Sequence, residues 1–213
     1  TKEGVIAGPK MLEHMVDTVL YLEGDERNDH RILRSVKNRF GTTNEVGIFQ
    51  MTTFGLEEVT NPSELFLAER RNDITGSTIF PSLEGTRPIL VEIQSLVSNA
   101  NFSAPQRNVN GFDFKRLSML LAVLGKRMGY KMGMKDVFVN LVGGLKINDP
   151  AADLSVITAL ASSEKDQLIK DSYVLIGEVG LGGEIRSVTR LEERINESAA
   201  LGFTDIIAPK SSI

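Results

Sequence analysis

The sequence has no cysteine and no tryptophan, and aromatic residues make up only 6% of its 213 residues. Without cysteine the chain forms no disulfide bond and offers no thiolate to a metal, which fits a reducing compartment. Neither histidine, His14 or His30, has a second ligand at metal-binding spacing, so we expect no metal site. No apolar run approaches the roughly 20 residues that cross a bilayer, and no signal peptide is recognisable. These absences predict a cytoplasmic protein without a membrane partner.

An excess of positive charge is missing too. The formal net charge is −4, which argues against general binding of polyanions, so any contact with nucleic acid must come from local basic clusters. The pattern G-x-x-x-x-G-K-[ST] does not occur, so the chain lacks the loop that cradles nucleotide phosphates. Its 41% apolar content is enough for a sizeable core, which suits one domain or one domain with a remnant of another.

The segment Lys37-Asn38-Arg39-Phe40-Gly41 carries the strongest functional signal. It places two cations one residue apart at the end of a predicted strand, Ile32 to Val36, where both side chains can point the same way. Lysine offers a compact charge and arginine a planar fork for two oxygens, which together suit a phosphate group. We expect Gly41 to let the chain turn away after the motif. The alternative is a pair of ordinary solvated charges.

A wider pattern surrounds this motif and resembles the bacterial RadA (Sms) family of DNA-repair motors. The resemblance covers essentially the whole chain and rests on four segments: Thr1-Lys2-Glu3-Gly4, Ala7-Gly8-Pro9, Leu12 to Asp17, and Lys37 to Gly41. It implies an α/β chain in which the C-terminal part of a RecA-like ATPase core precedes a Lon-protease-like α+β domain of the ribosomal protein S5 domain 2 type. Because the chain opens on Thr1, we expect it to be a C-terminal fragment of a longer protein.

Hydrophobic patterning predicts strands and helices on both sides of a junction. We expect residues 1–60 to be the last part of the ATPase domain, 61–75 the junction and 76–213 the Lon-like domain. Strands are predicted at 18–22, 30–36, 46–51, 56–59, 77–81, 88–97, 137–142, 173–179 and 205–208. Helices are predicted at 9–17, 61–70, 113–128, 150–162 and 191–201, with a polar loop at 98–111.

The resemblance implies a motor that uses ATP and Mg to promote branch migration of recombination intermediates. Its partners would be single-stranded and branched DNA, a recombinase of the RecA type, and copies of itself in a hexameric ring. In such rings a neighbouring subunit supplies cations to the γ-phosphate, which is worth about 10³ to 10⁵ in rate. We assign Lys37 and Arg39 to this role. The fragment by itself should bind none of these cofactors, and the zinc of the family would lie in an N-terminal finger outside it.

The resemblance also implies a peptidase fold without its catalytic pair. Lon-type peptidases use a serine nucleophile and a lysine base. The matching positions here are Ala151, within Asn148 to Asp153, and Glu192. We therefore expect a proteolytically inactive scaffold. Two alternatives stay open. The chain could be a peptidase with relocated catalytic residues, for which Ser155 and Lys146 are the only candidates, or a pure protein-interaction module.

A basic stretch from Arg107 to Asp136 runs against the acidic trend of the chain. On the predicted helix from Asp113, a step of about 100° per residue groups the cations on one side, opposite an apolar stripe. A DNA motor needs phosphate contacts that do not depend on sequence, although a solvated basic face is the commoner explanation. The candidate DNA contacts are Lys2, in a loop that faces DNA in RecA-like motors, and Arg107, Lys115, Arg116, Lys126 and Arg127.

Overall fold

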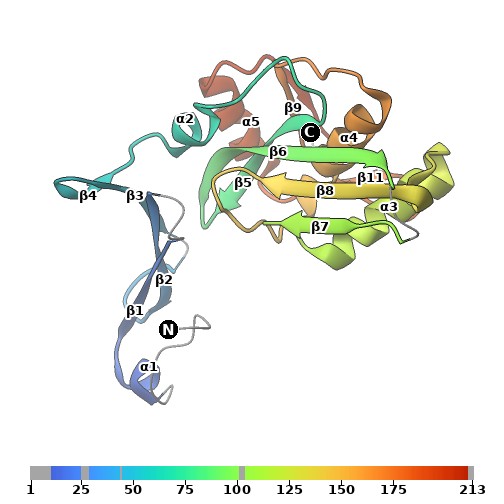
Figure 1. The fold of residues 1–213 in the computed structure, drawn as a ribbon. Coiled ribbons are helices and arrows are strands. Elements are labelled where there is room, and N and C mark those ends of the chain that lie inside the picture. Colours follow the sequence, from blue (N-terminus) through green and yellow to red (C-terminus); the bar gives the residue numbers. More distant parts are fainter. Residues whose placement is uncertain (1–10, 25–28, 44, 101–103, 211–213) are drawn as a thin grey trace. The chain divides into compact units, whose positions relative to one another are not determined.

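The computed structural model describes residues 11–24, 29–43, 45–100 and 104–210. The chain forms two compact units (Figure 1). The first contains Thr1–Thr60 and the turn Glu84–Arg87, and the second contains Asn61–Leu83 and Pro88–Ile213. Both units include helices and strands, so the chain is a mixed α/β protein. None of the helices in the described ranges is long and apolar enough to cross a membrane.

The first unit is a short helix followed by an antiparallel sheet with the strand order β1-β2-β3-β4. Its elements are α1 (Met11–Met15), β1 (Thr18–Glu23), β2 (His30–Asn38), β3 (Val46–Thr52) and β4 (Gly55–Glu58). The four strands predicted from the sequence are confirmed. Strand β2 runs two residues further than predicted because Val19 and Thr18 of β1 pair with Lys37 and Asn38. The first two motif residues therefore belong to the sheet.

Very little apolar surface is buried in this first unit. Ile48 on β3, which is 1% exposed, is the only buried apolar side chain among the described residues 11–60. Leu20, Leu22 and Val36 on β1 and β2 are each about half exposed, and Phe54 in the β3–β4 turn is almost fully exposed.

The second unit is built on a six-stranded mixed sheet with the order β12-β9-β5-β6-β8-β7. Strands β12 and β9, β9 and β5, and β7 and β8 pair in parallel, whereas β6 and β8 are antiparallel. The strands are β5 (Ser77–Glu84), β6 (Arg87–Asn99), β7 (Arg107–Asn110), β8 (Lys135–Leu141), β9 (Tyr173–Leu175) and β12 (Asp205–Ile207). Most of the buried apolar residues of the chain lie on this sheet and the helices that cover it.

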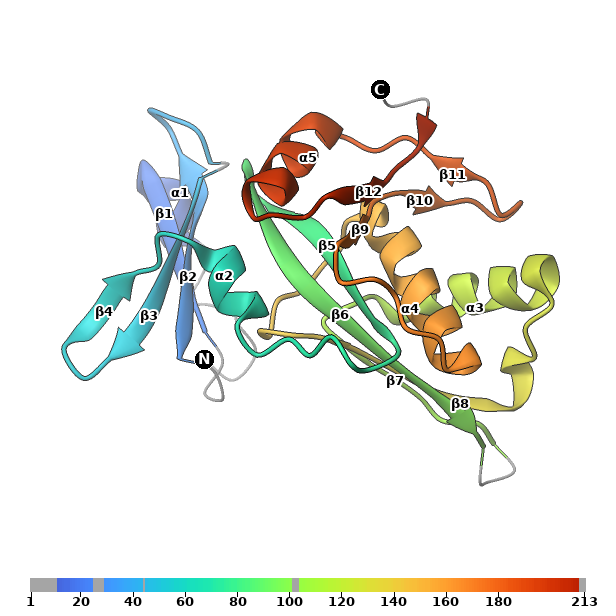
Figure 2. The same ribbon diagram turned by 90° about the horizontal axis from the view of Figure 1, so that it is seen from above.

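Helices α3 (Phe114–Met128) and α4 (Asp153–Lys165) pack side by side against one face of this sheet (Figure 2). Asp113 caps the first turn of α3, and Gly129 ends the helix at a φ of +75°. The four leucines of the predicted apolar stripe are buried, whereas Met128, expected on the same side, is 57% exposed. The remaining elements are α2 (Pro62–Leu67), the turns Met132–Met134 and Pro150–Ala152, α5 (Leu191–Ala200), and the hairpin of β10 (Glu178–Val179) and β11 (Ile185–Arg186).

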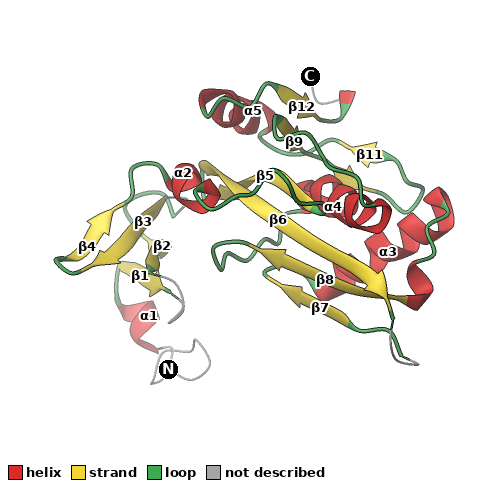
Figure 3. Cartoon of the chain, turned by 45° about the horizontal axis from the view of Figure 1, so that its top comes forward, coloured by secondary structure: helices red, strands yellow, loops and turns green. Residues whose placement is uncertain are grey.

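Two predictions about the second unit were wrong. The segment 98–111 was expected to be a loop, but its last residues form β7, the strand beside β8 in Figure 3. The free edge of β8 supplies hydrogen-bond partners that the polar sequence of β7 does not reveal. The strand expected at 173–179 is interrupted after Leu175, because the backbone of Gly177 turns aside to bond Ala151 and Leu154.

Candidate functional site

The Lys37–Gly41 motif lies where β2 ends, next to the connection between α1 and β1. The amide of Arg39 donates to the carbonyl of Asp17 over 2.9 Å, which continues the β1–β2 pairing by one residue. On β1, the hydroxyl of Tyr21 donates to Glu13 Oε1 over 3.0 Å, which ties α1 to the sheet and raises the pKa of Tyr21. Helix α1 is thus held beside the motif.

Both cations of the motif contact this neighbouring segment. Lys37 Nζ donates to the carbonyl oxygens of Glu13, at 2.8 Å, and His14, at 3.4 Å, near the C-terminal end of α1. Unpaired carbonyls at a helix end attract cations. Arg39 Nη1 lies 3.2 Å from Asp17 Oδ1 in an ion pair whose side chains are 73% and 52% exposed. Such an exposed pair is worth about 0–1 kcal/mol, so Arg39 can exchange Asp17 for another anion at little cost.

The rest of the motif forms a local turn. Asn38 Oδ1 accepts from the amide of Phe40 at 3.2 Å, and Asn38 Nδ2 donates to the carbonyl of Thr42 at 3.3 Å. The side chain of Phe40 is 81% exposed. The φ of Gly41 is not in the left-handed region, so the bend after the motif does not use the backbone conformation that favours glycine. A Cβ there would instead lie 2.9 Å from Asn38 Nδ2 and disturb the turn.

Not all of the cations predicted to form a basic face on α3 are exposed in the structure. Lys115 and Lys126 are exposed, and Arg127 is exposed although its Nε donates to the carbonyl of Leu181 at 3.2 Å. Arg107, on β7, donates to the carbonyl of Met132 at 3.3 Å. Lys2 and the loop around it lie outside the described residues.

Arg116 does not belong with these exposed cations. Its Nε and Nη2 each lie 2.5 Å from a carboxylate oxygen of Asp153, whose side chain is 0% exposed, and Nη2 also approaches Glu178 at 3.4 Å. The hydrogen bonds to Asp153 raise the pKa of Arg116. This ion pair joins α3 to α4, so the geometry argues against Arg116 as a DNA contact.

The two positions matched to the Lon-type catalytic pair hold residues that do no such chemistry. Ala151 is buried at 1% exposure and its methyl group is not a nucleophile, while Glu192 is exposed on α5. Along the sequence, Ala151 lies two residues after Asp149, and Glu192 lies two residues before Arg194. Asp149 and Arg194 form an ion pair with each other. Sequence reasoning missed this pair, because an arginine on an amphipathic helix is ordinarily exposed and nothing in the sequence links it to Asp149.

Ser155 and Lys146 do not form a replacement pair. Ser155 is 0% exposed, and its hydroxyl lies 2.7 Å from the carbonyl of Leu175 and 3.3 Å from that of Ile79, so it ties α4 to the sheet. Lys146 is exposed. A buried hydroxyl that already donates to backbone cannot reach a peptide substrate. Within the described residues, no cluster of three or more His, Asp or Glu side chains could hold a metal ion.

Comparison with known proteins gives two results. A family model described as subunit ChlI of Mg-chelatase matches residues 112–212, which lie in the second unit. Proteins named DNA repair protein RadA match the whole chain, with 52% identity in Halalkalibacterium halodurans, 54% in Streptococcus pneumoniae and 52% in Listeria monocytogenes. The chain covers 47%, 51% and 46% of these proteins, so it spans about half the length of the curated relatives it matches.

Proposed function

Because the chain belongs to the RadA family of DNA repair proteins, we propose that it is part of an ATP-dependent motor that promotes branch migration of recombination intermediates. In this proposal residues 1–60 complete a RecA-like ATPase domain, 61–75 are the junction, and 76–213 form a Lon-like domain without peptidase activity. The contact boundary at Thr60 and Asn61 supports this division. The chain lacks a phosphate loop, so ATP turnover belongs to the longer protein.

Lys37 and Arg39 would act on ATP bound by a neighbouring subunit of a ring, most simply a hexamer. Added cations stabilise the charge that develops on the transferred phosphoryl group. The observation that carries this assignment is the ion pair of Arg39 with Asp17, the only ion pair of Arg39 among the described residues, which is exposed and which a phosphate can replace. Lys37 is held by two neutral carbonyl oxygens, which a phosphate can also replace.

The second unit would serve as an assembly platform with accessory DNA contacts. Lys115, Lys126 and Arg127 are exposed on α3, and Arg107 lies on β7, so these cations and Lys2 remain candidates for sequence-independent phosphate contacts. The partners would be single-stranded and branched DNA and a recombinase of the RecA type, in the bacterial cytoplasm. The longer protein would use ATP and Mg, and would hold zinc in an N-terminal finger.

The test is ATP turnover of the full-length protein with single-stranded DNA, using Lys37→Ala and Arg39→Ala. Each variant should lose at least about 10³ in rate when assayed by itself. Mixed with a variant that is defective in its own phosphate loop, each should recover part of the activity, because one subunit then supplies the cation and the other the nucleotide site.

Asp17→Asn is the matched control. It removes the carboxylate that pairs with Arg39 and leaves both cations in place, so turnover should stay near that of the unchanged protein. If Asp17→Asn were as inactive as Arg39→Ala, the ion pair itself would be what matters, and the motif would be structural. Normal turnover in both Lys37→Ala and Arg39→Ala would also refute the assignment of these two cations to a neighbour's ATP.

A further inference from the structure

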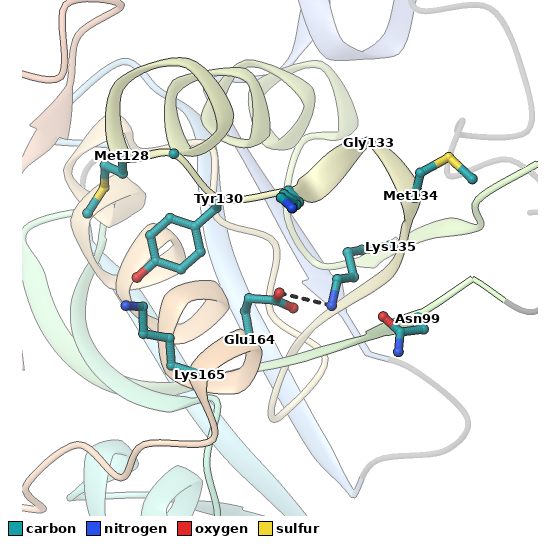
Figure 4. A pocket seen from close by; sticks show the side chains of 10 residues that line it. Asn99, Met128, Tyr130, Gly133, Met134, Lys135, Glu164 and Lys165 are labelled. Carbon is teal, nitrogen blue, oxygen red and sulfur yellow. Dashed lines mark ion pairs between the residues drawn. The ribbon is translucent and has the colours of Figure 1, made fainter.

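A pocket of about 700 Å³ lies in the second unit, and neither Asp149 nor Arg194 lines it (Figure 4). The ends of α3 and α4, the turn Met132–Met134, the start of β8 and the end of β6 surround it. The charged side chains that line it are those of Lys131, Lys135, Glu164 and Lys165.

The pocket carries a small surplus of positive charge. Three lysines against one glutamate leave two positive charges, and the ion pair of Lys135 with Glu164, at 2.9 Å, uses one lysine locally. In the described part of the chain no ion pair involves Lys131 or Lys165. The C-terminal ends of α3 and α4 add about half a negative charge each, which lowers the surplus to about one. This charge favours binding of an anion, but a surplus of about one positive charge gives a ligand with many negative charges little extra affinity.

Two exposed methionines add apolar surface to the walls of the pocket. The side chains of Met128 and Met134, which are 57% and 67% exposed, lie on opposite sides of it in Figure 4. Methionine is flexible and polarisable, and it is common on surfaces that adapt to bound peptides. Lys165 Nζ lies 5.5 Å from the centre of the Tyr130 ring, so a cation already occupies one face of the only aromatic ring among the described residues that line this pocket.

We propose that this pocket binds a short acidic peptide segment of a partner protein. Carboxylates of the peptide pair with Lys131 and Lys165, and an apolar side chain of the peptide packs between Met128 and Met134. A peptide matches the observations better than a nucleic acid for two reasons: the surplus of positive charge is small, and phosphates would leave the exposed methionine side chains without a partner. In addition, Lys165 already covers one face of Tyr130, which leaves less room for base stacking. The proposal does not depend on the ATPase role of the longer protein.

The test is a titration of the 213-residue chain into a fluorescein-labelled oligoaspartate peptide that ends in leucine and phenylalanine, followed by fluorescence anisotropy. We expect saturable binding that weakens with salt. The variant Lys131→Glu/Lys165→Glu should raise Kd at least about tenfold. Lys146→Glu/Lys210→Glu changes net charge by the same amount on exposed cations that do not line the pocket, and should leave Kd within about twofold. Circular dichroism checks that both variants are folded.

Two further arms separate the alternatives. A peptide in which serine replaces the leucine and phenylalanine should bind about tenfold more weakly, because the methionine walls lose their partner. A single-stranded oligonucleotide should not displace the labelled peptide. No binding at about 1 mM of the chain, equal losses in the two double variants, or displacement by the oligonucleotide would each overturn the proposal.

Discussion

The guanidinium of Arg194 and the carboxylate of Asp149 form an ion pair inside the second unit, in which the arginine side chain is 0% exposed. Arg194 also donates to the carbonyls of Thr189 and Pro81 and lies 5.4 Å from the centre of the Phe80 ring. Asp149 accepts a hydrogen bond from the amide of Ala151 at 2.9 Å. The pair therefore joins α5 to the turn that begins α4, two residues along the chain from Ala151 and from Glu192.

Asp149→Asn should destabilise the second unit by about 3–5 kcal/mol, because it leaves a buried arginine without its counter-ion. The asparagine can still cap the turn at Pro150. Asp113→Asn is the control: it also replaces a helix-capping aspartate, at the start of α3, but faces no buried cation, so it should cost less than about 0.5 kcal/mol. Urea unfolding followed by circular dichroism measures both. Equal costs would mean that the charge on Asp149 contributes nothing.

Arg116→Ala should cost about 3–5 kcal/mol of unfolding free energy, since Asp153 would remain buried with only the amide of Val179 as a partner. Lys115→Ala, one residue earlier on an exposed part of the same helix, should change stability by less than about 0.5 kcal/mol. The same urea experiment serves. A small effect of Arg116→Ala would restore this arginine as a candidate DNA contact.

Gly76→Ala should be far more damaging than Gly129→Ala. Both glycines have a positive φ, +81° and +75°, so alanine at either pays a similar backbone penalty of about 1 kcal/mol. A Cβ at Gly76 would lie 2.1 Å from the carbonyl oxygen of Ser95, whereas nothing lies within 4 Å of one at Gly129. We expect a total of at least about 3 kcal/mol for Gly76→Ala. Indistinguishable urea midpoints would show that β6 relaxes freely.

Acidification should weaken the first unit through His30. Burial lowers the pKa of His30, an effect that Asp29 opposes and Arg31 reinforces. The unfolded chain then binds a proton more readily than the native chain, so stability is complete above the unfolded value of about 6.5 and falls as the pH drops toward the lowered native pKa.

The measurement is the urea midpoint of the β2 and β3 amide signals in NMR spectra between about pH 7.5 and 5.5. The midpoint should fall with pH in the unchanged chain and in His14→Gln, in which the other histidine is removed. In His30→Gln the fall should be smaller. A midpoint that responds in the same way in both variants would assign the pH effect to other groups.

Local sequence signals predict those helices and strands whose two ends are marked by residues within or next to the element. Helix α3 follows from the capping Asp113, the buried leucine stripe and Gly129, and the antiparallel strands of the first unit follow from short apolar runs separated by polar turns. Strand β7 does not follow, because its residues become a strand only where β8 offers an edge.

For the site residues too, some can be recognised from the sequence and others only from the fold. The Lys37–Gly41 motif can be found from the sequence because its residues are contiguous. Its partners at α1 and Asp17 can not, because β1–β2 pairing brings them together. Arg116 and Asp153, or Arg194 and Asp149, are far apart in sequence, and a charged residue is expected to be solvated until the fold shows its partner.

Ile48 is the one buried apolar side chain among the described residues 11–60, so we expect the first unit to resist digestion poorly. A segment with so small a core opens at low free energy, and a protease cuts the open form. Protection should begin where the buried residues become frequent, at Pro62, Ser63 and Phe66 of α2. Brief treatment of the native chain with a nonspecific protease should therefore remove β1–β4 and leave a stable product that starts near Asn61.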